Sequence, residues 1–220
     1  MVWGTILRFI LEVPLSSNRW ENAVAHLRAV DPRWVTLLDS AGHCTLVPRK
    51  DRFGTLVRAI IGQQISSRAA TTIDARLHTL SGGPHQANRL IAVGEAGLRS
   101  CGLSGVKARY VLNLAEAVRD GHLPLSRIGR LADDEIKRKL TAIKGIGPWT
   151  AEMFLIFSLN RPDVLSVGDL GVRAGLRKFH DLAELPSPRE CETLTEPWRP
   201  YRSVAMWYLW RSLDAPKSSA

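Results

Sequence analysis

The apolar positions of the chain recur mostly at intervals of three or four residues, which is the spacing of amphipathic helices. The stretch from Asn18 to Val30 has this spacing, and Ser17 or Asn18 is the expected cap. Strand-like alternation is confined to the first residues and to Cys44–Val47. The pattern therefore predicts a mostly α-helical protein, with further helices after Pro32 and over about 53–61, 66–80, 90–101, 107–118, 133–143, 150–159, 170–179, 188–194 and 200–213.

Few breaks interrupt this helical pattern. The Ser-Gly-Gly-Pro stretch at 81–84 is a candidate edge of a lobe, and no fixed repeat or linker is present. The opening stretch MVWGTILRFILEV is apolar, but Arg8 and Glu12 interrupt it and no basic segment precedes it. We therefore expect a buried first strand or helix there, and neither a membrane span nor a signal peptide.

One predicted helix is interrupted within TAIKGIGPWTAEMF, residues 141–154. Gly145 and Gly147 permit positive φ and the close approach of another molecule. Pro148 suits the first turn of a following helix, whose amides, together with Lys144, would attract an anion. These residues alone leave two interpretations open. The stretch is either a hairpin that grips a phosphate or an ordinary helix-ending glycine followed by a turn.

The charge balance is the unusual feature of the composition. The 220 residues suffice for one large domain or two small lobes, and 45% apolar and 23% charged residues are ordinary for a globular protein. Thirty Lys and Arg residues against 21 Asp and Glu residues give a net charge of +9. This excess favours a polyanionic partner, nucleic acid before a membrane, although many basic proteins bind neither.

Cysteine and histidine residues are few and scattered. Cys44, Cys101 and Cys191 form no CxxC pair and no disulfide framework, and the six histidines show no ligand spacing. These counts argue against a structural metal held by side chains and favour a reducing compartment.

Four stretches carry a family resemblance: LVRAIIGQQISSRAATTI (56–73), LRSCGLSGVKARYVLNLAEAV (98–118), LTAIKGIGPWTAEMFLIFSL (140–159) and DVLSVGDLGVRAGL (163–176), with a weaker one at WRPYRSVAMWYLW (198–210). In this order they resemble the helix-hairpin-helix DNA glycosylase superfamily, most closely its 3-methyladenine DNA glycosylase II branch in compact form. The resemblance implies an all-α fold of two helical lobes with a central cleft for a flipped nucleotide. Residues 1–220 would form one such unit, with the hairpin motif at 140–159 and an N-terminal extension of undetermined role at 1–15.

The family's catalytic aspartate matches Asp169, at the start of a predicted helix. A fixed carboxylate can stabilise positive charge on a sugar whose N-glycosidic bond is breaking, or can orient the attacking water. Judged without the resemblance, Asp169 is more readily a helix cap, and one aspartate can do both. Arg173 would pair with Asp169, contact a phosphate or lie on the surface.

The resemblance also indicates which chemistry is missing. Bifunctional relatives carry a Schiff-base lysine where this chain has Trp149, and an indole cannot replace an amine. Relatives with an iron–sulfur cluster need four C-terminal cysteines, whereas Cys191 stands alone there. Both features predict a monofunctional enzyme that requires no cofactor. Trp149, Trp210 and Met153 are the expected base pocket, although relatives often have an aromatic residue at the position of Met153, and both tryptophans could instead be core.

Three further groups of residues follow from the matched motifs. Gln63 and Gln64 occupy the loop that fills the hole left by a flipped base, where some relatives have leucine in place of Gln64. Lys144, Gly145, Ile146 and Gly147 are the expected phosphate site, and the main-chain carbonyls of Thr141, Ile143 and Gly145 match a monovalent cation site (Na⁺ or K⁺). Ser66, Arg68 and Lys107 are additional candidates for phosphate contact, with solvated surface charge as the default interpretation.

The resemblance predicts an enzyme that excises alkylated bases of the 3-methyladenine or 7-methylguanine type from double-stranded DNA. It would act as a monomer inside the cell, in the cytoplasm or nucleoid of a bacterium or the nucleus of a eukaryote. Two alternatives remain at this point. One is a non-catalytic helix-hairpin-helix DNA-binding module, and the other is a glycosylase for hypoxanthine, uracil or a mismatched base.

Overall fold

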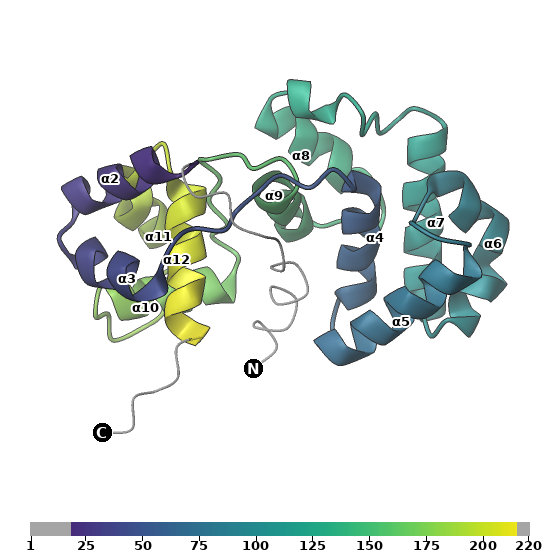
Figure 1. The fold of residues 1–220 in the computed structure, drawn as a ribbon, viewed down its shortest axis with the longest axis horizontal. Coiled ribbons are helices and arrows are strands. Elements are labelled where there is room, and N and C mark those ends of the chain that lie inside the picture. Colours follow the sequence, from purple (N-terminus) through teal and green to yellow (C-terminus); the bar gives the residue numbers. More distant parts are fainter. Residues whose placement is uncertain (1–18, 215–220) are drawn as a thin grey trace. The chain divides into compact units, whose positions relative to one another are not determined.

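The computed structural model describes residues 19–214, and this part of the chain is helical with no strand (Figure 1). The predicted opening strand or helix, the extension at 1–15 and the proposed caps Ser17 and Asn18 lie outside the described residues. The helices are α2 (Glu21–Val30), α3 (Arg33–Ala41), α4 (Arg52–Gly62), α5 (Ser67–Leu80), α6 (Ala87–Ser100), α7 (Gly105–Arg119), α8 (Asp133–Thr141), α9 (Pro148–Phe157), α10 (Leu170–Phe179), α11 (Pro188–Thr195) and α12 (Arg202–Asp214), with short 3₁₀ turns η1 (Ile128–Arg130) and η2 (Glu196–Trp198).

The chain forms two compact units. The described part of unit 1 comprises residues 48–159, and the described part of unit 2 comprises residues 19–47 and 160–214. The boundaries therefore fall at 47/48 and 159/160. The prediction that the glycine break at 81–84 marks a lobe edge is wrong, because this turn connects α5 and α6 within unit 1.

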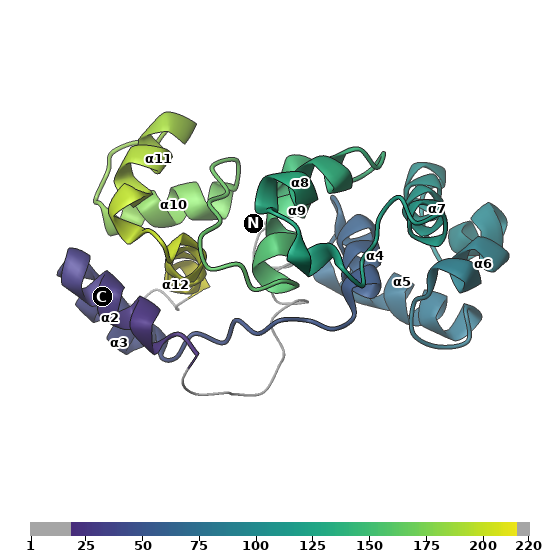
Figure 2. The same cartoon turned by 90° about the horizontal axis from the view of Figure 1, so that it is seen from above.

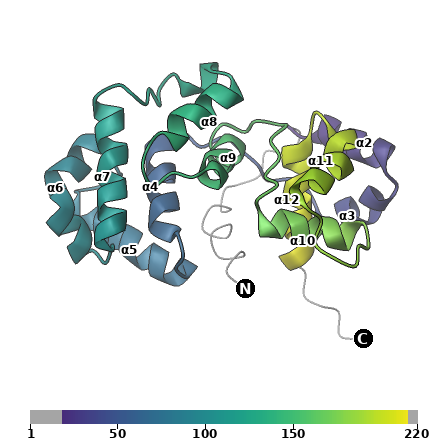
Figure 3. The same cartoon turned by 180° about the vertical axis from the view of Figure 1, so that it is seen from behind.

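Helix α7 is the middle element of unit 1. It packs against α6 on one side and α4 on the other, as Figures 1 and 3 show, while α4 also packs on α5 and α9, and α8 packs on α9. The core of unit 1 is formed by the apolar stripes of α5, α6, α7 and α8, as their spacing predicts, and by α9, whose residues 150, 151 and 153–157 are all buried. Its fully buried side chains include Leu56, Ile60, Leu77, Leu90, Leu98 and Leu114.

Helix α12 is the central helix of unit 2. Every residue from 202 to 210 is buried, and α12 lies between α10 and α3 (Figures 1 and 2). The core beside it is aromatic, with Trp34 in ring contact with Phe179, Trp198 and Tyr208. A helix apolar nearly all round is stable only when other elements enclose it, as here.

The helix starts agree with the sequence in most places. Ser66, where the predicted helix over 66–80 begins, caps α5 by accepting from the Ala69 amide. Helix α2 begins later than expected, with Trp20 at its N-cap position, and Asp133 lies in the first turn of α8 and does not cap it.

The segment Cys44–Val47 forms no strand. The Leu46 carbonyl accepts from the indole of Trp20 and the side-chain amide of Asn160, so side chains and not a neighbouring strand satisfy this backbone. Among the described residues, no helix has the length and apolar character needed to cross a bilayer.

Candidate DNA-binding and catalytic site

The interrupted stretch at 141–154 is a helix-hairpin-helix. Helix α8 ends at Thr141 and α9 begins at Pro148. Between them the Ile146 amide donates to the Ile143 carbonyl at 3.0 Å, which closes the turn. The two isoleucines are buried, whereas Lys144 is exposed. The turn thus has an apolar inner side that anchors it and a cationic outer side.

Position 145 requires glycine for two reasons, its backbone conformation and the lack of room for a Cβ atom. Its φ is +105°, which L side chains rarely adopt, and a Cβ added there would lie 2.3 Å from Cγ of Tyr110 on α7. The hairpin backbone therefore lies directly against the Tyr110 ring. At Gly147, by contrast, a Cβ would meet no atom within 4 Å.

Helix α9 starts as the sequence predicted. Gly147 is its N-cap and has no side chain to bond the first amides, and Pro148 occupies the first turn. Trp149 follows and is half-buried, while Met153, one turn later, is buried. Of the two expected pocket residues on this helix, Trp149 is thus the one with accessible ring surface.

The predicted wedge residues Gln63 and Gln64 have different environments. The Gln63 side-chain amide donates to the Gly145 carbonyl at 3.0 Å, so it contacts the hairpin. Gln64 is exposed and has a φ of +57°, an unusual value for a residue that is not glycine. Of the two predicted wedge residues, Gln64 is thus the exposed one.

Lys107 is not a surface charge. Its Nζ donates to the carbonyls of Ile61 at 2.8 Å and Gln63 at 2.5 Å, where α4 ends. Burial lowers the pKa of this ammonium group. Both contacts hold the ammonium against the protein's own backbone, and because an ammonium has a third N–H donor, a phosphate contact of the half-buried Lys107 stays a prediction.

Asp169 caps α10, as the alternative interpretation of the sequence expected. Its Oδ1 accepts from the Val172 amide at 2.7 Å and from Nε1 of Trp210 at 3.0 Å, and the residue is 0% exposed. Trp210 is itself 5% exposed. The indole expected to line a base pocket is thus, in this structure, a hydrogen-bond donor to the predicted catalytic carboxylate.

The neighbours of Asp169 explain how the indole reaches it. A Cβ on Gly171 would lie 2.9 Å from Oδ1 of Asp169 and 3.0 Å from Cδ1 of Trp210, so only glycine allows this approach. Arg173 directs its Nε to the Pro186 carbonyl at 2.8 Å, one turn beyond the aspartate. The sequence contains no signal for the Trp210 contact, which joins residues 41 positions apart.

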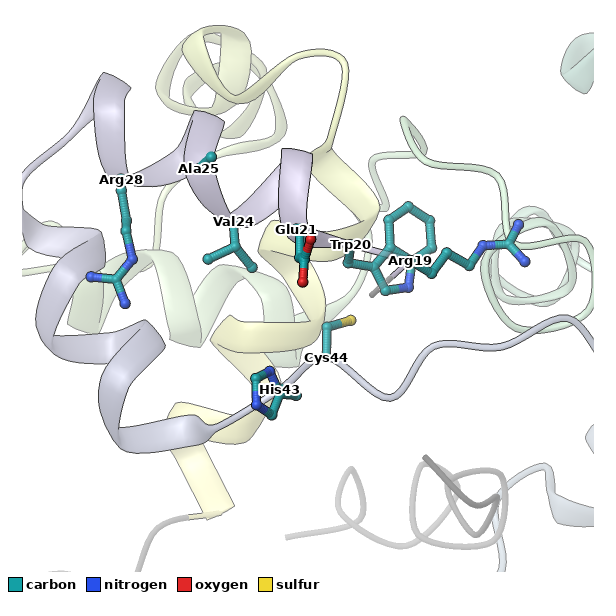
Figure 4. Close-up of a pocket in the computed structure, with 8 residues that line it drawn as sticks. All are labelled: Arg19, Trp20, Glu21, Val24, Ala25, Arg28, His43 and Cys44. Carbon is teal, nitrogen blue, oxygen red and sulfur yellow. The ribbon is translucent and has the colours of Figure 1, made fainter. Parts of the chain in front are cut away.

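A cavity of about 270 Å³ opens on unit 2, but it contains none of the predicted site residues (Figure 4). It is lined by Arg19, Trp20, Glu21, Val24, Ala25, Arg28, His43 and Cys44. Burial raises the pKa of the Cys44 thiol to about 12, so the thiol stays protonated at neutral pH and is a poor nucleophile. No group of three or more His, Cys, Asp or Glu side chains suited to a metal occurs among residues 19–214.

The structure thus assembles two sets of predicted residues, one in each unit. Unit 1 holds the hairpin, the Gln63–Gln64 loop, Trp149 and Met153, and unit 2 holds Asp169 beside Trp210. Sequence reasoning missed the support of the hairpin by Tyr110, since nothing along the chain marks that contact.

The two hairpin glycines provide a matched test of this geometry. Gly145→Ala should destabilise the protein by about 2–4 kcal/mol, from left-handed strain plus the Tyr110 clash, which lowers the melting temperature by roughly 5–10 °C. Gly147→Ala should cost under about 1 kcal/mol, because φ is ordinary and the space is open. Thermal unfolding of both variants measures this. Equal melting temperatures would contradict the assigned support by Tyr110.

Comparison with known proteins agrees with these features. Residues 57–200 match the family described as HhH-GPD superfamily base excision DNA repair protein. An alkylbase DNA glycosidase-like protein, mag2, of Schizosaccharomyces pombe is 31% identical, with 87% of this chain and 93% of the relative covered. DNA-3-methyladenine glycosylase 1 of the same yeast is 35% identical, with 86% of each chain covered.

Solved structures give the same result. A DNA-3-methyladenine glycosidase from Bacillus halodurans superposes with a TM-score of 0.82 at 35% identity, covering 92% of this chain and 94% of the other. The S. pombe 3-methyladenine DNA glycosylase in complex with abasic DNA superposes with a TM-score of 0.80 at 33% identity, covering 90% and 100%. The expected family and all-α fold are confirmed, and the chain belongs to the HhH-GPD superfamily of base excision DNA repair proteins.

Proposed function

We propose that this protein is a monofunctional DNA glycosylase that hydrolyses the N-glycosidic bond of alkylated bases, of the 3-methyladenine or 7-methylguanine type, in double-stranded DNA. The observation that carries the proposal is Asp169, which occupies the family's catalytic position and is oriented through one oxygen by Val172 and Trp210. Relatives named DNA-3-methyladenine glycosylase that cover most of the chain support it.

The carboxylate suits the reaction electrostatically. Breaking the bond between sugar and base leaves positive charge on the sugar, and water then adds to its C1′. A fixed negative charge away from bulk water stabilises that charge more strongly than a solvated one. Because Asp169 is 0% exposed, the proposal requires DNA binding to uncover its carboxylate.

Trp149 fits the positively charged base. An indole face attracts a cation by roughly 0.5–2 kcal/mol and stacks on any flipped base. The half-buried ring of Trp149 has surface available for this contact, whereas Met153 beneath it is buried. Because Trp149 stands where bifunctional relatives have lysine, base release would not proceed through a Schiff base.

The hairpin suits sequence-independent binding of a phosphate. Lys144 is exposed in the turn that precedes α9, whose N-terminal amides and dipole also attract an anion. Phosphate contacts of this kind position a protein on DNA without reading bases. The net charge of +9 favours the same partner over the whole chain.

A monovalent cation is compatible with the hairpin backbone. The carbonyls of Ile143 and Gly145 each accept one hydrogen bond, from the Ile146 amide and Gln63 respectively, and a carbonyl oxygen has two lone pairs. With Thr141 they would hold Na⁺ or K⁺, which would supply positive charge toward a phosphate.

A non-catalytic DNA-binding module is the second candidate. The full burial of Asp169 and its capping of α10 favour it, because a cap needs no access to substrate. Either candidate would act as a monomer on double-stranded DNA inside the cell.

Replacing the carboxylate separates these candidates. Asp169→Asn keeps a side-chain oxygen for the Val172 amide and the Trp210 indole, so the fold and DNA affinity should persist while release of methylated purine falls at least about 100-fold. Single-turnover release of labelled base and a binding titration measure both quantities. Activity close to that of the parent protein would leave Asp169 as a cap only.

A second substitution tests whether the hydrogen bond from Trp210 orients Asp169. Trp210→Phe removes the donor to Asp169, and the single-turnover rate should fall about tenfold with DNA affinity unchanged, since one hydrogen bond to a charged group is lost. Trp207→Phe on the same helix is the control, because the buried Trp207 Nε1 has no partner among the described residues. Equal rates for the two variants would exclude orientation of Asp169 by Trp210.

The monofunctional assignment predicts the product. Incubation with damaged duplex should release base and leave the strand intact until alkali is added, because no lysine occupies the Trp149 position. Borohydride added during turnover should trap no protein–DNA adduct. A trapped adduct would mean that another amine attacks the sugar.

A further inference from the structure

The loop between α4 and α5 is fixed to the rest of unit 1 at two points. The first is Lys107, whose ammonium donates to the carbonyls of Ile61 and Gln63. These carbonyls belong to the end of α4, where a cation interacts favourably with the helix dipole and with unpaired acceptors. The half-buried ammonium, whose pKa burial lowers, bonds the backbone on the N-terminal side of Gln64.

The second point is the Gln63 side chain. Its Nε2 donates to the Gly145 carbonyl at 3.0 Å, across 82 positions of sequence. Gly145 is also the residue whose backbone lies against Tyr110. The loop and the phosphate-binding hairpin are therefore in direct contact through a single amide.

Helix α7 supports both elements. Lys107 and Tyr110 are three residues apart, so they lie on the same face of α7. Lys107 contacts the loop and Tyr110 contacts the hairpin. A single helix thus sets the spacing between the two.

Gln64 is the exposed residue that directly follows these two contacts in the loop. Its left-handed backbone, with a φ of +57°, is unfavourable for a residue with a Cβ. Such a conformation persists where the surrounding structure enforces it, and the contacts of Gln63 with Gly145 and Lys107 lie directly before Gln64 in the chain.

We propose that Gln63, Lys107 and Tyr110 are positioning residues that hold Gln64 at a fixed spacing from the hairpin. When the hairpin binds a phosphate, Gln64 then lies where it can fill the space of the departing nucleotide. Gln63 acts through Gln64 and does not itself enter the duplex. This inference rests on the proposed function, because it concerns how the damaged base leaves the helix.

The first test is a double-mutant cycle with Gln63→Ala, Gln64→Ala and the combined variant. The readouts are 2-aminopurine fluorescence beside the lesion, which reports flipping without chemistry, and single-turnover base release. Either single change should lower flipping and release from a paired lesion about tenfold, and the combined variant should be little worse. Fully multiplied effects would mean that Gln63 enters the duplex independently, which overturns the proposal.

The second test is Lys107→Met, with Arg109→Met on the same helix as the charge-matched control. Arg109 is exposed and pairs only with Glu95 among the interactions described here. All measurements are made well below the melting temperature of each variant. Lys107→Met should lower flipping about tenfold while binding to undamaged duplex stays within about twofold of the control.

A substrate whose lesion already lies outside the helix provides the internal check. In a single-base bulge no wedge is needed, so Gln63→Ala and Lys107→Met should release base at nearly the parental rate. A defect of equal size on paired and bulged lesions would assign these residues to general stability and overturn the proposal. If the parent protein releases no base at all, the proposed function fails, whereas the fluorescence comparison still decides the positioning role.

Discussion

The close approach of the hairpin backbone to Tyr110 is the constraint on which unit 1 depends. It requires glycine at 145, because both a φ of +105° and a distance of 2.3 Å exclude a Cβ. The Gly145 carbonyl in turn accepts from Gln63, and Gln63 is bonded by Lys107. The hairpin, the loop and α7 are thereby one connected structure, and displacement of any one of them would move the others.

Unit 2 contains a comparable arrangement around a carboxylate. Asp169 is a helix cap and the candidate for catalysis at once, and these roles need not conflict. The cap fixes one oxygen against the Val172 amide, and the Trp210 indole fixes it from a second direction. An oriented, desolvated carboxylate is what stabilisation of a positively charged sugar requires.

Two arginines of unit 2 pair with the same carboxylate, that of Asp163, but differ in their exposure to solvent. Arg202 is 8% exposed and bonds Asp163 through Nε at 2.7 Å, whereas Arg199 is half-exposed and contacts the same carboxylate at 2.8 Å. Breaking the buried pair would leave a charge without a partner, which is costly. These two arginines therefore serve the fold, and the 30 Lys and Arg residues of the chain are not all available to a polyanionic partner.

The sequence by itself determined the helical class and the cap at Asp169, because both depend on residues close together along the chain, while the order of the matched motifs indicated the family and, through it, the hairpin. Helical spacing, Gly-x-Gly-Pro and Gly-Asp before an apolar run act locally. Only the tertiary structure decided that Gln63 contacts Gly145, that Lys107 faces inward and that Trp210 meets Asp169. These contacts join residues 82, 46 and 41 positions apart, and the packing of helices that brings them together leaves no local pattern.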